Sequence, residues 1–259
     1  MSVNLLLPPT RPDADAGFIV MQADRCHPMS GSNAMCVVTV LLETGMLPMH
    51  VPATRVALEF VPSFALHLDR ALEVDGLGTL AVDIAWGGDW FCLVDAGSCG
   101  FAVRPDEVRD LIELGGRIKR AAHEQVTVRH PTMAEPRTIS FVMFCASPEA
   151  PGAPDRNGTV MHPGRMDRSP WGTGTAARLA VMQARGEVAV GATLTMRSVI
   201  DSEFRATITG ATTLGEYPAV LPRISGHAWI FALYQLGVDP SDPYPLGYTM
   251  ADAWGPGYA

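Results

Sequence analysis

The sequence contains two short glycine-rich motifs, Met29-Ser-Gly-Ser-Asn-Ala (29–34) and Pro170-Trp-Gly-Thr-Gly-Thr (170–175). Each motif precedes a stretch of apolar residues at helical spacing, and each stretch stops at a glycine, Gly45 or Gly186. The two glycines fall at the same offset, because 45 minus 30 and 186 minus 171 both equal 15. The alignment matches three pairs: Ser30 with Trp171, Gly31 with Gly172 and Ser32 with Thr173. This pattern is typical of a duplicated unit and predicts two pseudo-symmetric lobes.

Both motifs are predicted to begin a helix. The first helix is expected over Ser32–Thr44, with Ser32 or Asn33 as its N-cap, and the second over Thr173 or Gly174 to Arg185. The free N–H groups of a first helical turn, together with the helix dipole, favour an anion. Glycine there allows close approach of a ligand, and a Ser or Thr hydroxyl adds a donor. Two such termini that face each other could hold one carboxylate, although either motif alone could be an ordinary helix cap.

The rest of the chain alternates between helical and strand patterns. Residues 105–124 predict a third helix, and residues 147–158 are rich in proline and glycine and predict a loop. Strands are expected at six places: 18–22, 79–82, 90–94, 139–144, 192–196 and 207–208. This mixture indicates an α/β or α+β protein.

Composition excludes several classes of protein. Of the 259 residues, 47% are hydrophobic and 18% are charged, which is typical of a folded chain. The net charge of −8 and the absence of basic runs argue against nucleic-acid binding. No apolar run is long enough for a membrane span or a secretory signal, so a cytoplasmic protein is expected. The five cysteines form no CxxC pair, so neither a disulfide framework nor a metal site is predicted.

Several segments together resemble the proline racemase family, which includes 4-hydroxyproline 2-epimerases and trans-3-hydroxy-L-proline dehydratases. The most specific segment is Asp167-Arg-Ser-Pro-Trp-Gly-Thr-Gly-Thr. Others are Asp13-Ala-Asp-Ala-Gly-Phe-Ile-Val-Met, His27-Pro-Met-Ser-Gly-Ser-Asn, Cys36-Val-Val-Thr-Val-Leu-Leu-Glu-Thr-Gly, Leu77-Gly-Thr-Leu-Ala-Val-Asp-Ile-Ala-Trp-Gly-Gly-Asp, Ser225-Gly-His-Ala-Trp-Ile and Asp239-Pro-Ser-Asp-Pro. The likeness therefore extends through most of the chain.

The resemblance implies a fold of two similar α/β lobes with the site in the cleft between them. It also implies catalysis without a cofactor, by two residues that exchange the α-proton of a small imino acid from opposite faces. Ser30 and Trp171 fall at the positions of the two catalytic acid/base residues. The positions implied to bind substrate are Gly31, Ser32, Asp167, Gly172 and Thr173, with Asp167 near the amino group. A homodimer is a further possibility, and no nucleic-acid or membrane partner is expected.

The same resemblance implies how the lobes divide the chain. Residues 1–100 are expected to form the first lobe, residues 101–234 the second, and the tail 235–259 is expected to return a strand to the first. Compared with the family, the first lobe looks shortened, because its opening strands and a hairpin near Leu58-Glu59-Phe60 are missing.

Trp171 departs from the family's catalytic pattern. An indole N–H can donate a hydrogen bond but is neither a usable acid nor a base, and it is a large side chain beside a small substrate. Ser30 is a weak base unless another group activates it. Three functions stay open: a 4-hydroxyproline 2-epimerase by ancestry, a trans-3-hydroxy-L-proline dehydratase that needs one base, or a non-catalytic member of the family.

Overall fold

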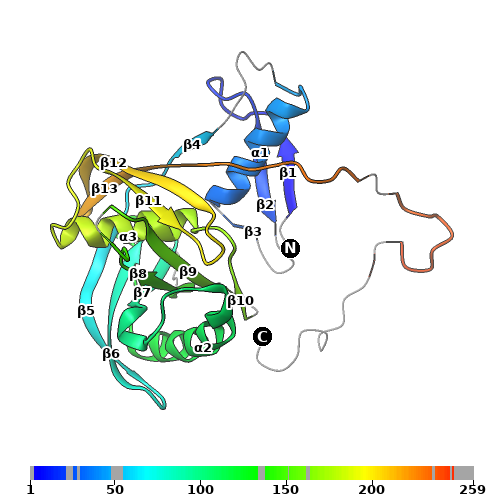
Figure 1. The fold of residues 1–259 in the computed structure, drawn as a ribbon. Coiled ribbons are helices and arrows are strands. Elements are labelled where there is room, and N and C mark those ends of the chain that lie inside the picture. Colours follow the sequence, from blue (N-terminus) through cyan, green and yellow to red (C-terminus); the bar gives the residue numbers. More distant parts are fainter. Residues whose placement is uncertain are drawn as a thin grey trace.

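The computed structural model describes residues 3–21, 26–27, 30–47, 55–133, 138–150, 152–161, 164–234, 237–245 and 247. They form a mixed α/β protein with a small lobe and a large lobe (Figure 1). The fold class predicted from the sequence is therefore confirmed. The boundary expected near residue 100 stays a prediction, and the expected return of the tail, 235–259, lies mostly outside the described residues.

The small lobe consists of one antiparallel sheet and one helix. Its strands are β1 (Val3–Leu7), β2 (Gly17–Met21) and β3 (Cys26–His27), in the order β1-β2-β3. Helix α1 (Gly31–Glu43) follows directly. The amide of Asn4 on β1 donates to the Asn33 side-chain oxygen at 3.0 Å, which ties the sheet to the first turn of α1.

The large lobe is built on a ten-stranded sheet. Its path is β4-β13-β12-β11-β9-β8-β7-β6-β5, with the short β10 paired to β9. Most neighbours are antiparallel, but β7 with β8 and β9 with β11 are parallel. The bounds are β4 Val56–Glu59, β5 Phe64–Val74, β6 Gly78–Trp86, β7 Trp90–Asp95, β8 Phe141–Ala146, β9 Asp155–Met161, β10 Arg165–Met166, β11 Thr193–Arg197, β12 Glu203–Leu214 and β13 Tyr217–Gly226.

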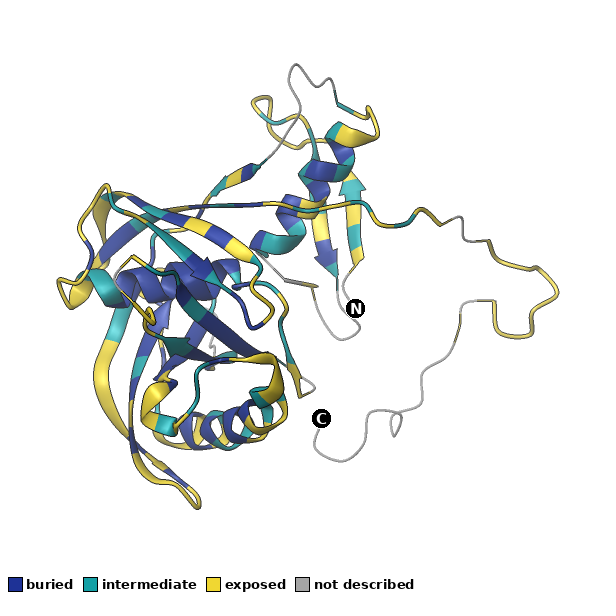
Figure 2. Cartoon of the chain, in the orientation of Figure 1, coloured by how far each residue is buried: buried dark blue, intermediate teal, exposed yellow. Residues whose placement is uncertain are grey.

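Helix α3 (Gly172–Ala184) lies inside the curve of this sheet and contacts β5, β6, β7, β12 and β13. Backbone hydrogen bonds between Ser63 and Val220, of 3.0 and 2.8 Å, join the segment before β5 to β13 and so bring the two ends of the sheet together. Ten consecutive residues of α3, 172–181, are buried, as expected of a helix enclosed on all sides (Figure 2).

Helix α2 (Val108–Gln125) covers the outer face of the sheet and follows a 3₁₀ turn, Pro105–Glu107. A second short 3₁₀ turn lies at Gly97–Cys99. The amphipathic pattern of α2 explains its place, because its apolar face packs on β5, β8 and β9 and its other face is exposed. Gly115 is required there, since a Cβ on it would lie 2.7 Å from Val160 Cγ2.

The two matched helices are confirmed, each one residue earlier than predicted. Both contain 13 residues, and both are followed by a glycine with φ of 74°, Gly45 and Gly186. The predicted N-caps were wrong, because Ser30 and Trp171 hold the N-cap positions. Gly31 and Gly172 are the first residues of the two helices. The loop predicted over 147–158 was also wrong at its end, where Asp155 to Gly158 form part of β9.

Candidate functional site

The N-termini of α1 and α3 meet at their first glycines. A Cβ built on Gly31 would lie 3.2 Å from Gly172 Cα, and a Cβ built on Gly172 would lie 3.1 Å from Gly31 Cα. Both glycines are buried, and neither has a positive φ. They are therefore needed for the close approach of the two backbones rather than for an unusual conformation. The structure thus brings the two sequence motifs face to face.

Both helix termini lack a cap from their own N-cap side chain. Among the described residues, the backbone N–H groups of Gly31, Ser32, Gly172 and Thr173 have no hydrogen-bond partner. Unpaired N–H groups and the positive ends of two helix dipoles meet at one point, which favours a bound anion. We call this arrangement of the four residues the paired-terminus site.

Phe60 completes this site and was not singled out from the sequence. It follows β4, where its N–H donates to Pro222 O at 2.8 Å, and its side chain is 7% exposed. Its Cζ would lie 2.7 Å from a Cβ on either Gly31 or Gly172. The ring of Phe60 therefore packs against the point where the two helices meet. No local pattern could reveal this role, because Phe60 is 29 residues from one glycine and 112 from the other (60 minus 31; 172 minus 60).

Ser30 has an ordinary extended backbone, with φ of −151° and ψ of 111°. The Asn33 amide donates to its Oγ at 2.7 Å, and Asn33 in turn accepts from Asn4. This chain of neutral amides leaves the Ser30 hydroxyl hydrogen available as a donor, but it supplies no base to remove that hydrogen. Within the described residues, the hydrogen bond from Asn33 holds the Ser30 side chain in place but provides no base that would activate it.

Trp171 has a strained backbone, with φ of 64° and ψ of 105°. A bulky residue at positive φ is unusual, and such strain costs roughly 1–3 kcal/mol. The preceding carbonyl holds it in place, since Pro170 O accepts from buried Asn157 Nδ2 at 3.1 Å and from Thr175 Oγ1 at 3.0 Å. The Trp171 indole packs on Phe141, with ring centroids 4.6 Å apart, so it is anchored to the large lobe.

Asp167 lies just before this strained turn. Its Oδ1 accepts from the Ser169 N–H at 2.5 Å, and Ser169 Oγ accepts from the Trp171 N–H at 3.2 Å. Burial raises the pKa of Asp167 above its ordinary value, although the Ser169 hydrogen bonds partly oppose this shift. Asp167 is therefore linked through Ser169 to the N-terminus of α3.

Two glycines support the site from behind. A Cβ on Gly87 would lie 2.1 Å from Thr173 O, and a Cβ on Gly88 would lie 3.0 Å from Thr173 Cγ2. The turn between β6 and β7 thus presses against the first turn of α3. Within the described part of the chain, no group of three or more His, Cys, Asp or Glu side chains could hold a metal ion. No described helix is long and apolar enough to cross a membrane.

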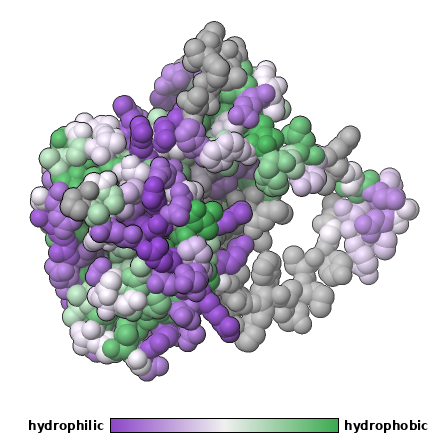
Figure 3. All heavy atoms as spheres, viewed as in Figure 1, coloured by the Kyte–Doolittle hydropathy of each residue, from purple (hydrophilic) through white to green (hydrophobic). Residues whose placement is uncertain are grey.

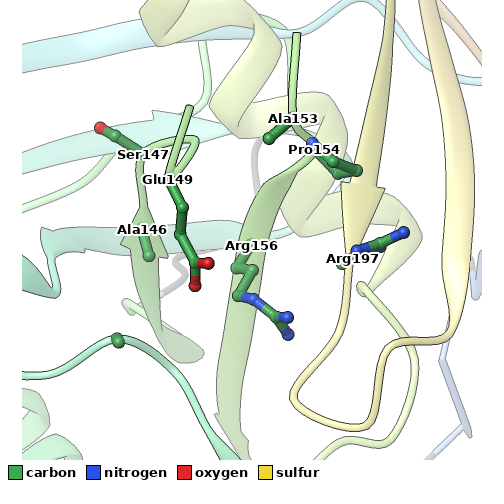
Figure 4. A pocket seen from close by; sticks show the side chains of 8 residues that line it. Ala146, Ser147, Glu149, Ala153, Pro154, Arg156 and Arg197 are labelled. Carbon is green, nitrogen blue, oxygen red and sulfur yellow. The ribbon is translucent and has the colours of Figure 1, made fainter. Parts of the chain in front are cut away.

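A separate pocket lies away from the paired-terminus site. Glu149, Arg156 and Arg197 surround it, from β9, β11 and the loop after β8 (Figure 4). Arg156 is paired with Asp201 at 2.6 Å and Arg197 with Glu203 at 2.8 Å. Because both guanidinium groups already have acidic partners, this pocket is a weaker candidate for an anion than the paired termini.

Comparisons with known proteins agree with this arrangement. A family model described as proline racemase matches residues 1–61 and 52–249, in two segments that meet at 52–61. The two matched ranges overlap at Leu58, Glu59 and Phe60, where the resemblance to the family predicts a missing hairpin.

Two crystal structures are similar over almost the whole chain. A "probable proline racemase" from Agrobacterium radiobacter, with bound carbonate, is 37% identical with a TM-score of 0.87. This chain aligns over 98% of its own length and 81% of that protein. A hydroxyproline epimerase from Agrobacterium vitis, with bound trans-4-hydroxy-L-proline, is also 37% identical, with a TM-score of 0.88 and coverage of 99% and 80%. About a fifth of each relative therefore has no counterpart here.

A more distant match shares the fold alone. It is a phenazine biosynthesis protein of the PhzF family from Bacillus anthracis, 10% identical with a TM-score of 0.52. The match covers 84% of this chain and 79% of that one.

Proposed function

Because this chain belongs to the proline racemase family, we propose that it binds proline or hydroxyproline by the carboxylate at the paired-terminus site. The proposed chemistry is α-proton abstraction without a cofactor, most similar to that of a 4-hydroxyproline 2-epimerase. Gly31, Ser32, Gly172 and Thr173 bind the carboxylate in this proposal, and Asp167 binds the amino group.

One observation carries the proposal: N–H groups from two helices, which have no hydrogen-bond partner among the described residues, converge across a contact between two glycines. A carboxylate has two oxygens and several lone pairs, so it can accept from both termini at once. The carbonate and the hydroxyproline bound to the two relatives are ligands of this kind, which supports the choice of ligand.

The proposed chemistry is one-sided. In this proposal Ser30 gives its hydroxyl proton to solvent, takes the α-proton from one face of the α-carbon, exchanges it with solvent and returns a solvent proton to the same face. Trp171 at the matching position supplies neither acid nor base. A proton that leaves and returns through Ser30 keeps the configuration of the α-carbon. We therefore expect exchange with solvent to exceed epimerisation.

Two other outcomes follow from the same feature. Elimination of water from trans-3-hydroxy-L-proline needs one base and help for the departing hydroxyl, so a dehydratase tolerates Trp171 better than an epimerase does. A non-catalytic protein that only binds an imino acid is the remaining outcome, and the neutral Asn33 partner of Ser30 favours it over an enzyme with a strongly activated base.

The test is deuterium exchange followed by proton NMR. The protein is mixed with trans-4-hydroxy-L-proline in deuterated water, and separately with trans-3-hydroxy-L-proline to detect loss of water. We expect the α-proton signal to decay in the first sample, and Ser30→Ala to abolish the decay. Ser241→Ala, in the exposed tail, is the matched control and is expected to leave the rate unchanged. If calorimetry detects binding but the α-proton does not exchange, the enzymatic function is contradicted and the non-catalytic binding protein is supported.

A further inference from the structure

The Trp171 side chain is fixed against its own helix. Its indole Nε1 donates to Thr173 Oγ1 at 2.9 Å, and its ring packs on Phe141. Its Cδ1 lies 3.3 Å from the position of a Cβ on Gly174, so a larger residue at 174 would crowd the indole. The indole is therefore held by a hydrogen bond to Thr173 and by packing on Phe141, and glycine at 174 leaves room for it.

The direction of the Trp171–Thr173 hydrogen bond follows from chemistry. An indole N–H can only donate, so Thr173 Oγ1 must be the acceptor. The hydroxyl hydrogen of Thr173 is then left to donate elsewhere. Among the described residues, Thr173 Oγ1 has no partner besides the indole. The bond thus makes the Thr173 hydroxyl a donor toward any third group.

The orientation of the Thr173 hydroxyl is fixed from a second side. Its methyl carbon Cγ2 lies 3.0 Å from the position of a Cβ on Gly88, whose φ of 108° favours glycine. In this rotamer the Thr173 methyl group faces Gly88 while Oγ1 accepts from the indole. Thr173 is 5% exposed, so few other partners can reach its hydroxyl.

We propose that Trp171 is a positioning residue, which holds the Thr173 hydroxyl as a hydrogen-bond donor to the bound carboxylate. Trp171 then contributes to affinity for acceptor-only anions, such as carboxylates and carbonate, and takes no part in proton transfer. This inference rests on the proposed carboxylate site. This role would give Trp171 a function in ligand binding, although its side chain is neither an acid nor a base.

The test is a double-mutant cycle in the full chain, with affinity for trans-4-hydroxy-L-proline measured by calorimetry. Trp171→Phe keeps an aromatic ring on Phe141 but removes the N–H, and we expect binding about three- to tenfold weaker. Thr173→Val removes the hydroxyl and keeps the shape, and we expect a loss of about tenfold or more. The double variant should bind no more weakly than Thr173→Val alone.

Controls separate this role from a general structural one. Trp229→Phe, in the exposed segment that follows β13, should leave affinity unchanged. If Trp171→Phe weakens binding equally in the presence and absence of the Thr173 hydroxyl, the positioning role is wrong. Should Trp171→Phe fail to fold, the indole N–H resonance of the wild-type protein gives a second measurement. The resonance of the Trp171 indole should shift when trans-4-hydroxy-L-proline is added to the wild-type protein, and the corresponding resonance of the Thr173→Val variant should stay fixed.

Failure of the two proposals can be told apart. A wild-type protein that binds neither trans-4-hydroxy-L-proline nor acetate would overturn the carboxylate site and, with it, the role of Trp171. A wild-type protein that binds, with Trp171→Phe binding equally tightly, would overturn the role of Trp171 alone.

Discussion

Replacing Gly172 with alanine tests whether the contact between α1 and α3 makes the site. The new Cβ would lie 2.7 Å from Phe60 Cζ and 3.1 Å from Gly31 Cα. Since carbon atoms pack best at about 3.5 Å or more, the ring must retreat by about 0.8 Å (3.5 minus 2.7). The Gly31 neighbour is backbone, so rotation of a side chain cannot relieve that second contact.

The expected magnitude follows from two opposing effects. Overpacking of this kind costs about 1–3 kcal/mol, while alanine in a helix gains up to about 1 kcal/mol over glycine. We expect a net loss of about 1–2 kcal/mol in the free energy of unfolding, which lowers Tm by about 2–8 °C in a chain of this size. Because the two termini are pushed apart, affinity for trans-4-hydroxy-L-proline should fall at least about tenfold, as expected when pre-positioned donors move by about an ångström.

Calorimetry measures both quantities, by thermal unfolding and by titration. Gly116→Ala in α2 is the matched control, because only Arg120 Nη1, at 3.9 Å, lies near its Cβ position. That variant should gain about 0.5–1 kcal/mol and bind normally. Adding Phe60→Leu to Gly172→Ala should recover part of the lost stability. If Gly172→Ala is as stable as the wild type and binds with the same Kd, the two termini are not in functional contact.

Three further predictions concern the proton-transfer position, a buried carboxyl and the exposed segment that follows β13. Trp171→Cys should create or greatly raise epimerisation of trans-4-hydroxy-L-proline, measured by polarimetry, because a helix N-terminus lowers the pKa of a thiol. Trp171→Ser should not have this effect. If Trp171→Cys is inactive, the missing second acid/base at position 171 is not the cause of inactivity. Asp167→Asn should raise Tm at pH 7 but not at pH 3. Because burial raises the Asp167 pKa, the folded state keeps this proton to higher pH than the unfolded chain, so stability falls as pH rises from about 4 to the raised value. Asp69→Asn is its control and should destabilise near neutral pH, since Arg185 lowers the Asp69 pKa; the same sign for both variants would contradict this account. Phe231→Ser, in the exposed segment that follows β13, should reduce self-association in analytical ultracentrifugation, because Phe231 is 93% exposed. If the variant and the wild type have the same sedimentation coefficient at high concentration, this segment is not a contact.

The prediction for Phe231 rests on a group of exposed apolar and aromatic side chains after β13. The side chains of Trp229, Phe231, Leu233 and Tyr234 are between 78% and 93% exposed, although all four are large and apolar or aromatic. The segment that carries them leaves the large lobe after β13 and, in the view of Figure 1, passes across the small lobe. On the face shown, hydrophobic residues also gather over the small lobe (Figure 3). We propose this segment as a contact of a homodimer, because exposed apolar side chains that lie together in sequence are typical of association sites.

The sequence predicted the elements that carry strong local signals. Gly45 and Gly186 end their helices in the left-handed conformation, and the apolar spacing before them is helical, so both 13-residue helices were found. Their starts were one residue early in the structure because residues 30 and 171 take the N-cap position without a capping side chain. The preference for Ser or Asn at an N-cap pointed to Ser32 or Asn33, two or three residues beyond the N-cap that α1 uses, Ser30.

Features that depend on distant contacts were missed. The first half of β9 has Asp155 and Asn157 at positions that normally indicate a loop, yet both are buried. Arg178 on α3 compensates them, with hydrogen bonds of 2.6 Å to Asp155 and 2.7 Å to Asn157. Such buried polar pairs are stable only as a completed network, and a sequence pattern does not show that completion.

The site itself was half predictable. Its four N–H donors lie at Gly31, Ser32, Gly172 and Thr173, where the motifs place them, because a helix N-terminus leaves such groups unpaired wherever it occurs. That the two termini touch, with Phe60 against both glycines, depends on how the large sheet curves around α3. The positive φ of Trp171 has no signal in its residue type, since a tryptophan rarely adopts it.

The most direct test of the paired-terminus site is an amide NMR titration with trans-4-hydroxy-L-proline. Backbone resonances of Gly31 and Ser32 on one helix, and of Gly172 and Thr173 on the other, report separately on the two termini. If one carboxylate is held between them, all four amide protons move downfield together, with a single Kd and one ligand per chain. If the resonances of only one helix move, or the two helices give different Kd values, the two termini do not share a ligand.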